Sequence, residues 1–87
     1  MGQASDVTIL TPALCRAARG LLDWTQSQLA ERAGVSRSTV KDYEGCRHDA
    51  HRATESQLRI ALENGGAEFI NLEGGKMGLY ARSNLVE

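Results

Sequence analysis

The sequence lacks the features that staple a small secreted domain or anchor a protein in a membrane. It has only two cysteines, Cys15 and Cys46, and nothing near its start resembles a secretion signal. The first apolar run, in MGQASDVTILTP, is too short for the core of a signal peptide and follows no basic segment. No stretch approaches the roughly 20 apolar residues of a membrane span. We therefore expect a cytoplasmic protein whose two thiols stay reduced.

The chain also lacks a strong charge of either sign. Its formal net charge is -1 at pH 7, whereas a strongly basic balance is the usual electrostatic sign of a nucleic-acid-binding domain. Residues 25–52 hold slightly more basic than acidic side chains, and residues 53–87 hold slightly more acidic ones. The charge pattern alone allows nucleic-acid binding without favouring it.

Residue patterns that carry enzyme or metal chemistry are missing as well. No nucleophile, base and acid occur together at a credible spacing, and the glycine pairs at 65–66 and 74–75 do not form a phosphate-binding loop. The segment CRHDAH at 46–51 offers close-set metal-binding side chains, but it lacks the second pair of ligands that zinc sites usually have. We expect this segment to be a solvated loop, and we expect no catalytic residues, no metal and no cofactor.

What the sequence does contain is a series of helix start and stop signals. Thr11 followed by Pro12 predicts the start of a first helix that ends at Trp24, and Thr25 with Gln28 forms a capping box for a second helix. Further signals predict that helix to end at 34, a third helix to run over 36–44 and a polar loop to fill 45–53. A second capping box, Thr54 with Gln57, predicts a fourth helix that stops at the glycines 65–66.

The hydrophobic period changes after this fourth helix. Residues 67–72 and 78–82 predict two strands, separated by a turn at 73–76. The chain thus divides into an N-terminal tail (1–10), a helical domain (11–66) and a C-terminal β-hairpin (67–87). Because a lone hairpin is marginal in water, the hairpin must pack on the helices or pair with another subunit. The expected fold class is mainly α, with four to five helices and a short C-terminal hairpin.

The turn between the second and third helices has the requirements of a helix-turn-helix. The small Ala30 can sit where the two helices approach closely, Gly34 can adopt the positive φ of the turn, and Val35 and Val40 can anchor the second helix in the core. The N-terminal end of that helix, residues 36–39, is then free of packing. Its exposed N–H groups and positive dipole suit phosphates and base edges.

The segment SQLAERAGVSRSTVKDYEGCR resembles the helix-turn-helix domain of Cro/phage-repressor-type (XRE-type) transcriptional regulators, a resemblance that covers residues 12–64. The residues that carry it are Gln26, Leu29, Ala30, Ala33, Gly34, Val35, Ser36, Val40, Tyr43 and Glu44-Gly45. Less specifically, AEFINLEGGKMGLYAR is similar to the segment that follows the helices in small stand-alone members. The resemblance implies a repressor-like fold of four or five helices and binding to double-stranded DNA.

The resemblance also implies roles for individual residues, with the helix 36–44 lying in the major groove. The positions that would contact base edges are Arg37, Ser38 and Asp42. The positions that would contact the DNA backbone are Gln26, Ser36, Thr39, Lys41 and Arg47. A carboxylate facing DNA repels phosphate unless it accepts a hydrogen bond from a cytosine amino group or orients an arginine. We favour the second role, in which Asp42 orients Arg37.

A near-neutral module of this size would bind DNA weakly alone, so we expect a homodimer on an inverted repeat. Its simplest role is that of a repressor, and a dual regulator is the second interpretation. The expected dimer contact is the hairpin, through Phe69, Ile70, Leu72, Leu79 and Tyr80. Contact through the helices remains open. An alternative function is an antitoxin or antiactivator whose main target is a partner protein, since the acidic C-terminal third could face a basic one. A third alternative is a purely structural interaction domain that leaves the DNA-binding surface unused.

Overall fold

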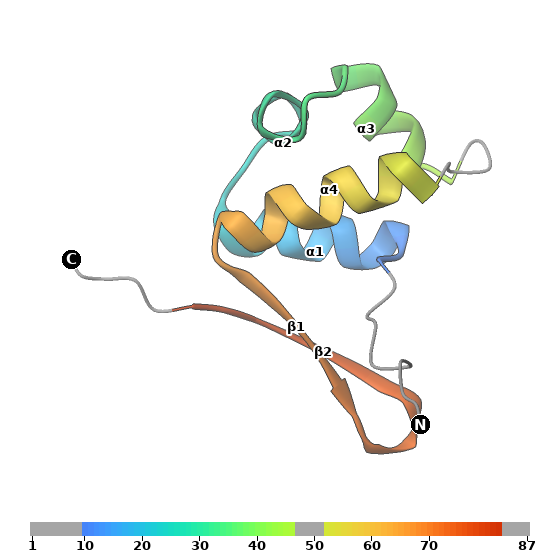
Figure 1. Ribbon diagram of the computed structural model, residues 1–87, viewed down its shortest axis with the longest axis vertical. Coiled ribbons are helices and arrows are strands. Elements are labelled where there is room, and N and C mark those ends of the chain that lie inside the picture. The colour runs from blue at the N-terminus through green and yellow to red at the C-terminus, as the bar shows by residue number, and fades with distance from the viewer. Residues whose placement is uncertain (1–9, 47–51, 83–87) are drawn as a thin grey trace.

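The computed structural model (Figure 1) describes residues 10–46 and 52–82. Within these ranges the chain forms four α-helices followed by two antiparallel strands joined by a 3₁₀ turn. In order these are α1 (Pro12–Leu22), α2 (Gln26–Ala33), α3 (Arg37–Glu44), α4 (Arg52–Asn64), β1 (Ala67–Leu72), η2 (Glu73–Gly75) and β2 (Lys76–Ala81). The predicted fold class is confirmed. Most of the predicted tail (1–9), the loop at 47–51 and residues 83–87 lie outside the described ranges.

The first three helices begin where side-chain caps predict. The hydroxyl of Thr11 accepts a hydrogen bond from the backbone N–H of Leu14 at 3.1 Å. The capping box before α2 is complete: Thr25 Oγ1 accepts from the N–H of Gln28 at 3.1 Å, and Gln28 Oε1 accepts from the N–H of Thr25 at 2.8 Å. These bonds satisfy N–H groups that have no partner within the helix, so they fix where each helix starts.

The predicted end of the first helix is wrong by two residues. Helix α1 stops at Leu22, and Asp23 adopts a left-handed conformation (φ 61°) from which its N–H bonds the carbonyls of Arg19 and Gly20. Aspartate tolerates this conformation better than most residues, because its short polar side chain can hydrogen-bond locally. Trp24 therefore lies in the connection between α1 and α2 rather than at the end of a helix.

The predicted start of the fourth helix is also wrong. Helix α4 already includes Arg52 and Ala53, so Thr54 and Gln57 lie within it and form no capping box. The Thr-x-x-Gln spacing equals one helical turn, and it therefore also occurs inside helices. Arginine and alanine have high helix propensity, which favours extending the helix ahead of Thr54.

The hydrophobic core is built by all four helices and closed by the hairpin. Its fully buried side chains include Leu29, Val40, Leu58 and Leu62. Leu10, which we assigned to the tail, belongs to this core with 2% of its surface exposed, and its carbonyl accepts a hydrogen bond from the Tyr43 hydroxyl at 2.9 Å.

The hairpin leaves the end of α4 and packs its base against α1 and α4, as Figure 1 shows. Its register pairs Ala67 with Ala81 and Phe69 with Leu79. The second strand begins at Lys76, two residues before the predicted start. The difference arises because the turn needs only three residues, two of which, Gly74 and Gly75, adopt positive φ.

Candidate nucleic-acid interface

Helices α2 and α3 pack against each other through the residues that the helix-turn-helix pattern requires. Ala30 is buried at 4% exposure, and Val40 is fully buried. Gly34 between the helices has φ 74°, and its N–H donates to the carbonyls of Ala30 and Glu31. Val35 is half-buried against the core. The physical requirements stated for this turn are therefore met.

The N-terminal end of α3 projects from the protein. Ser36 caps the helix, with its hydroxyl accepting from the N–H of Thr39 at 3.1 Å and lying 2.8 Å from the Thr39 hydroxyl. The side chains of Arg37, Ser38 and Lys41 are exposed, and Thr39 is half-buried. Arg37 and Ser38 therefore lie at an exposed helix end that is available to a ligand. Lys41 lies in the last turn of α3, so the predicted contacts extend along the helix.

Asp42 is half-buried on α3. Among the described residues, the hydrogen bonds and ion pairs do not include one between Asp42 and Arg37. The two residues are five apart on a helix, which does not place them on the same face. The free protein thus offers no support for the orienting role, and the function of Asp42 stays a prediction.

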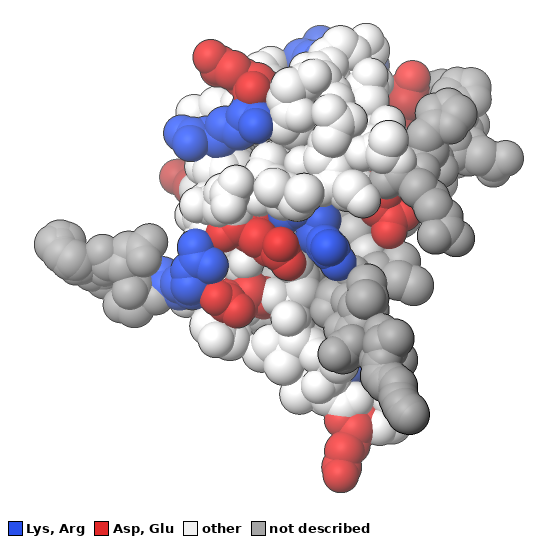
Figure 2. All heavy atoms as spheres, in the orientation of Figure 1, with Lys and Arg blue, Asp and Glu red and all other residues white. Residues whose placement is uncertain are grey.

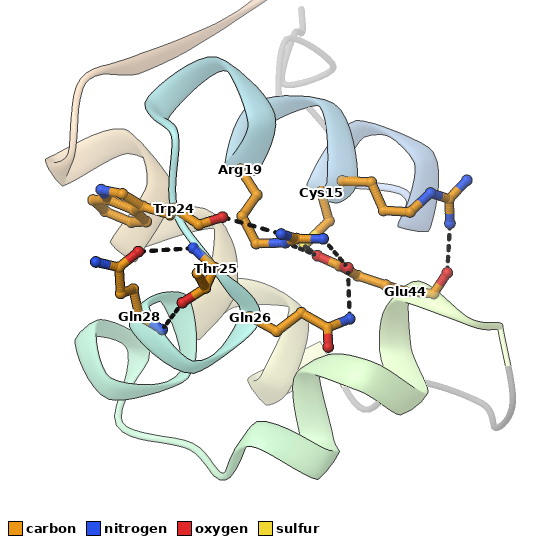
Figure 3. Close-up of polar contacts among 8 residues, drawn as sticks. Cys15, Arg19, Trp24, Thr25, Gln26, Gln28 and Glu44 are labelled. Atoms are coloured by element: carbon orange, nitrogen blue, oxygen red, sulfur yellow. Dashed lines mark hydrogen bonds and ion pairs between the residues drawn. The ribbon is translucent and has the colours of Figure 1, made fainter.

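Behind this surface, a buried carboxylate joins the first three helices (Figure 3). Glu44, the last residue of α3, is 4% exposed. Its two oxygens accept from Arg19 Nε and Nη2, each at 2.9 Å, in a two-pronged ion pair with α1. Gln26 Nε2 from α2 donates at 3.1 Å, and the Cys15 thiol donates at 3.3 Å.

The arginines of α1 also reach the backbone around this carboxylate. Arg19 Nη1 donates to the carbonyl of Trp24 at 3.0 Å, and Arg16 Nη1 donates to the carbonyl of Glu44. Arg19 thus bonds both the end of α3 and the connection that leads into α2. Since an unpaired charge in this position would be costly, the network fixes α3 relative to α1 and α2.

The network determines the ionisation of its members. Burial opposes the charge of Glu44, but the hydrogen bonds from Arg19, Gln26 and Cys15 outweigh it and hold the pKa of this carboxyl below its ordinary value. Burial, together with the neighbouring Glu44 charge, raises the pKa of the Cys15 thiol well above its usual range. Burial likewise raises the pKa of Tyr43. At neutral pH the carboxylate is charged, and the thiol and the phenol are protonated.

Gln26, a predicted backbone contact, is partly committed to this network. Its side-chain nitrogen donates to Glu44 with one of its two N–H groups, which leaves the second N–H and the carbonyl oxygen of the amide. As the first residue of α2, however, Gln26 also has a backbone N–H that no residue of the same helix can bond. A phosphate contact at this position can therefore use the backbone N–H or the second N–H of the side-chain amide.

Sequence reasoning missed Arg19 and Cys15 and gave Glu44 no role. One signal was available for Glu44: it lies four residues after Val40 and next to Tyr43, on the face of α3 that turns inward. A charge on that face needs a partner, but the partner is 25 residues away in the chain. Only the packing of α1 against α3 reveals it.

The loop that follows α3 lies mostly outside the described residues. Arg47 lies outside the described residues, as does most of the segment 46–51, and Cys46 is a free exposed cysteine. In the described ranges, no group of three or more His, Cys, Asp or Glu side chains could hold a metal ion. None of the helices in those ranges is long and apolar enough to cross a membrane. Figure 2 shows acidic and basic side chains interspersed over the helices on the face drawn.

Comparison with known families finds a match in the central segment. Residues 16–44, from within α1 to the end of α3, match the helix-turn-helix family model HTH_3. This segment is similar to the helix-turn-helix of that family. The match supports a DNA-binding transcriptional regulator of the XRE kind, and this family is one of DNA-binding proteins rather than enzymes. Comparison with curated proteins finds no match.

Proposed function

We propose that the protein is a sequence-specific regulator that binds an inverted-repeat operator as a homodimer, with α3 in the major groove of each half-site. The observation that carries this proposal is the exposed N-terminal end of α3, held in place by the buried Glu44 network. Recognition helices of a two-fold dimer bind half-sites about 34 Å apart, one turn of DNA. Repression is the simplest outcome, since a bound dimer occludes polymerase.

Within this proposal Arg37 supplies the main base contact. A guanidinium can donate two hydrogen bonds to O6 and N7 of a guanine, which discriminates by about 1–3 kcal/mol against other bases. Arg37 is exposed and has no ion-pair partner among the described residues. The Ser38 hydroxyl can donate a hydrogen bond to a base edge or accept one from it. Asp42 either accepts from a cytosine amino group or orients Arg37 on DNA.

The backbone contacts follow from the same placement. Lys41 is exposed on α3 and supplies a point charge for phosphate. Ser36 and Thr39 contribute hydroxyl groups near the start of α3, and Gln26 contributes its backbone N–H at the start of α2. Arg47 would extend this surface beyond α3.

The test is fluorescence anisotropy with the DNA upstream of the protein's own gene, at two salt concentrations and with excess non-specific competitor. We expect Arg37→Ala to lose about tenfold or more in the ratio of specific to non-specific affinity. Lys41→Ala should weaken both kinds of binding alike and reduce the salt slope by about one. Arg32→Ala is the control, because Arg32 lies on α2 and not on α3. Its guanidinium lies 4.6 Å from the centre of the Trp24 ring. Unchanged discrimination in Arg37→Ala would contradict the assignment of α3.

A further inference from the structure

The register of the hairpin divides its side chains between two faces. Residues directly opposite each other in an antiparallel pair share a face. Ala67, Phe69 and Leu79 share the inner face, where they pack against the helical core. The outer face therefore carries the alternate residues, Glu68, Ile70, Leu72, Lys76, Gly78 and Tyr80. Two of the five residues expected at the dimer contact, Phe69 and Leu79, thus contribute to the core of their own chain.

The middle of the outer face is an apolar patch. Leu72 and Tyr80 are each 49% exposed, and Ile70 between them is half-buried. Gly78 adds no side chain, and a Cβ atom there would lie 3.5 Å from Leu72 Cδ1 and 3.7 Å from Ile70 Cβ. Leu72 and Ile70 therefore extend over Gly78 towards each other. Among the described residues that pack against the helical core, Phe69 and Leu79 of the hairpin are included, but Ile70, Leu72 and Tyr80 are not.

Charges of both signs flank the patch at each end. At the base of the hairpin, Glu68 and Arg82 form an ion pair at 3.1 Å. At the tip, Glu73 and Lys76 are exposed. When two copies of such a face stack antiparallel about a two-fold axis, the tip of one copy meets the base of the other. The acidic and basic side chains at the tip of each copy, Glu73 and Lys76, then come near the Glu68–Arg82 pair of the other copy. The surface is therefore complementary to itself, as a two-fold interface requires.

We infer that the outer face of the hairpin, defined by Ile70, Leu72 and Tyr80, is the surface through which two copies of this chain associate, stacked face to face and antiparallel. This inference rests on the homodimer of the proposed function and specifies its contact. It differs from pairing of the strand edges, in which main-chain hydrogen bonds rather than these side chains would join the copies.

The position of the hairpin agrees with this assignment. The hairpin projects beyond α1 and α4, whereas α2 and α3 lie on the other side of those helices (Figure 1). Association through the outer face thus leaves both copies of α3 uncovered. The main-chain N–H of Arg82 bonds the carbonyl of Gly66 at 2.7 Å, and its side chain bonds the carbonyl of Glu63 at 2.9 Å. These bonds connect the base of the hairpin to the end of α4.

The experiment compares the same substitution on the two faces of the full-length chain. Analytical ultracentrifugation over a concentration series should give Leu72→Glu a dimer dissociation constant at least about tenfold above wild type, since each dimer contains two copies of the change. Met77→Glu is the matched control. Met77 is similarly exposed, at 38%, but lies on the inner-face register opposite Asn71, and its change should leave dimerisation within about threefold of wild type, below the hot-spot range.

Charge exchange gives a second test that does not depend on an apolar substitution. Lys76→Glu and Glu68→Lys should each weaken the dimer, and the double variant should recover most of the loss. Three results would overturn the inference: a wild-type chain that stays monomeric throughout, equal effects of Leu72→Glu and Met77→Glu, or loss of the dimer only on Ile60→Glu at the exposed surface of α4.

Failure of this inference can be separated from failure of the proposed function. A monomeric Leu72→Glu chain should still bind a single half-site duplex, and adding Arg37→Ala should remove its sequence preference. If the dimer contact lies elsewhere, half-site recognition by α3 is unaffected. If α3 does not bind DNA, half-site recognition is absent in every variant, whatever the outcome of ultracentrifugation.

Discussion

At the scale of single residues, the buried Glu44 carboxylate connects α3, the proposed recognition helix, to α1 and α2. It accepts four hydrogen bonds from three side chains, which come from α1 and α2. Charge-assisted bonds of this kind are about twice as strong as bonds between neutral groups. The same burial makes the network sensitive to the loss of one member, because the remaining charge is left without a partner.

The lowered pKa of Glu44 predicts a dependence of stability on acid. The folded protein binds the proton of Glu44 less readily than the unfolded chain does, so the unfolded state takes up more protons as pH falls. The stabilisation is fully present above the ordinary glutamate pKa of about 4.3 and is lost as pH falls through the lowered folded value.

Glu44→Gln should therefore unfold more easily at pH 7, by about 2 kcal/mol, and lose less stability than wild type on acidification. Urea unfolding followed by circular dichroism between pH 7 and pH 3 measures both effects. Glu31→Gln, at an exposed position on α2, is the control and should follow wild type. If Glu44→Gln and wild type lost the same unfolding free energy on acidification, the pKa of the Glu44 carboxyl would not be lowered by folding.

A second single-residue prediction concerns Gly65, at the end of α4. A Cβ atom at this position would overlap the six-membered ring of Trp24. Gly65→Ala should therefore destabilise the fold by about 1–3 kcal/mol, and most of this cost should disappear in a Trp24→Phe background, where the ring is smaller.

Thermal unfolding of the two single variants and the double variant measures this coupling. Gly20→Ala provides the opposite control, because nothing lies within 4 Å of a Cβ there and the residue is inside α1. It should stabilise the protein by about 0.5–1 kcal/mol. A Gly65→Ala cost that is the same with Trp24 and with Phe at position 24 would exclude the steric cause.

At the scale of elements, the sequence predicts the helix-turn-helix well because its boundaries are local. Thr25, Gly34 and Ser36 each form capping hydrogen bonds within one helical turn, and all three occupy the predicted cap positions. The start of α4 was missed because a Thr-x-x-Gln spacing suits a helix interior as well as a cap. The Glu44 network was missed because it depends on contacts between helices, and the two hairpin faces were not separated because their assignment needs the strand register.

The proposed recognition helix, α3, offers its own test at Asp42. Asp42→Asn removes an acceptor that suits the cytosine amino group and adds a donor that suits adenine. We expect the base preference to change at one position of each half-site, measured by competition binding against operators with single substitutions. Asp23→Asn, at the left-handed cap of α1, should leave the profile unchanged. An unchanged profile for Asp42→Asn would remove this residue from the base-contacting set.

At the scale of the whole molecule, the two ends of the protein have separate tasks in this account. In the proposed complex, the end with α2 and α3 faces DNA, and the hairpin at the other end joins the two copies. The net charge of -1 gives little general attraction to DNA, so affinity must come from paired half-sites and specific contacts. A dimer binds two half-sites at once, which raises affinity without any new contact to either one.

The measurement that tests this account most directly is selection of binding sites from a randomised duplex library by the wild-type protein and by Arg37→Ala. We expect wild type to enrich an inverted repeat with half-site centres about 10 base pairs apart, and Arg37→Ala to lose its preference at one symmetric pair of positions. Enrichment of no motif by the wild-type protein, or of the same motif by both proteins, would contradict this account.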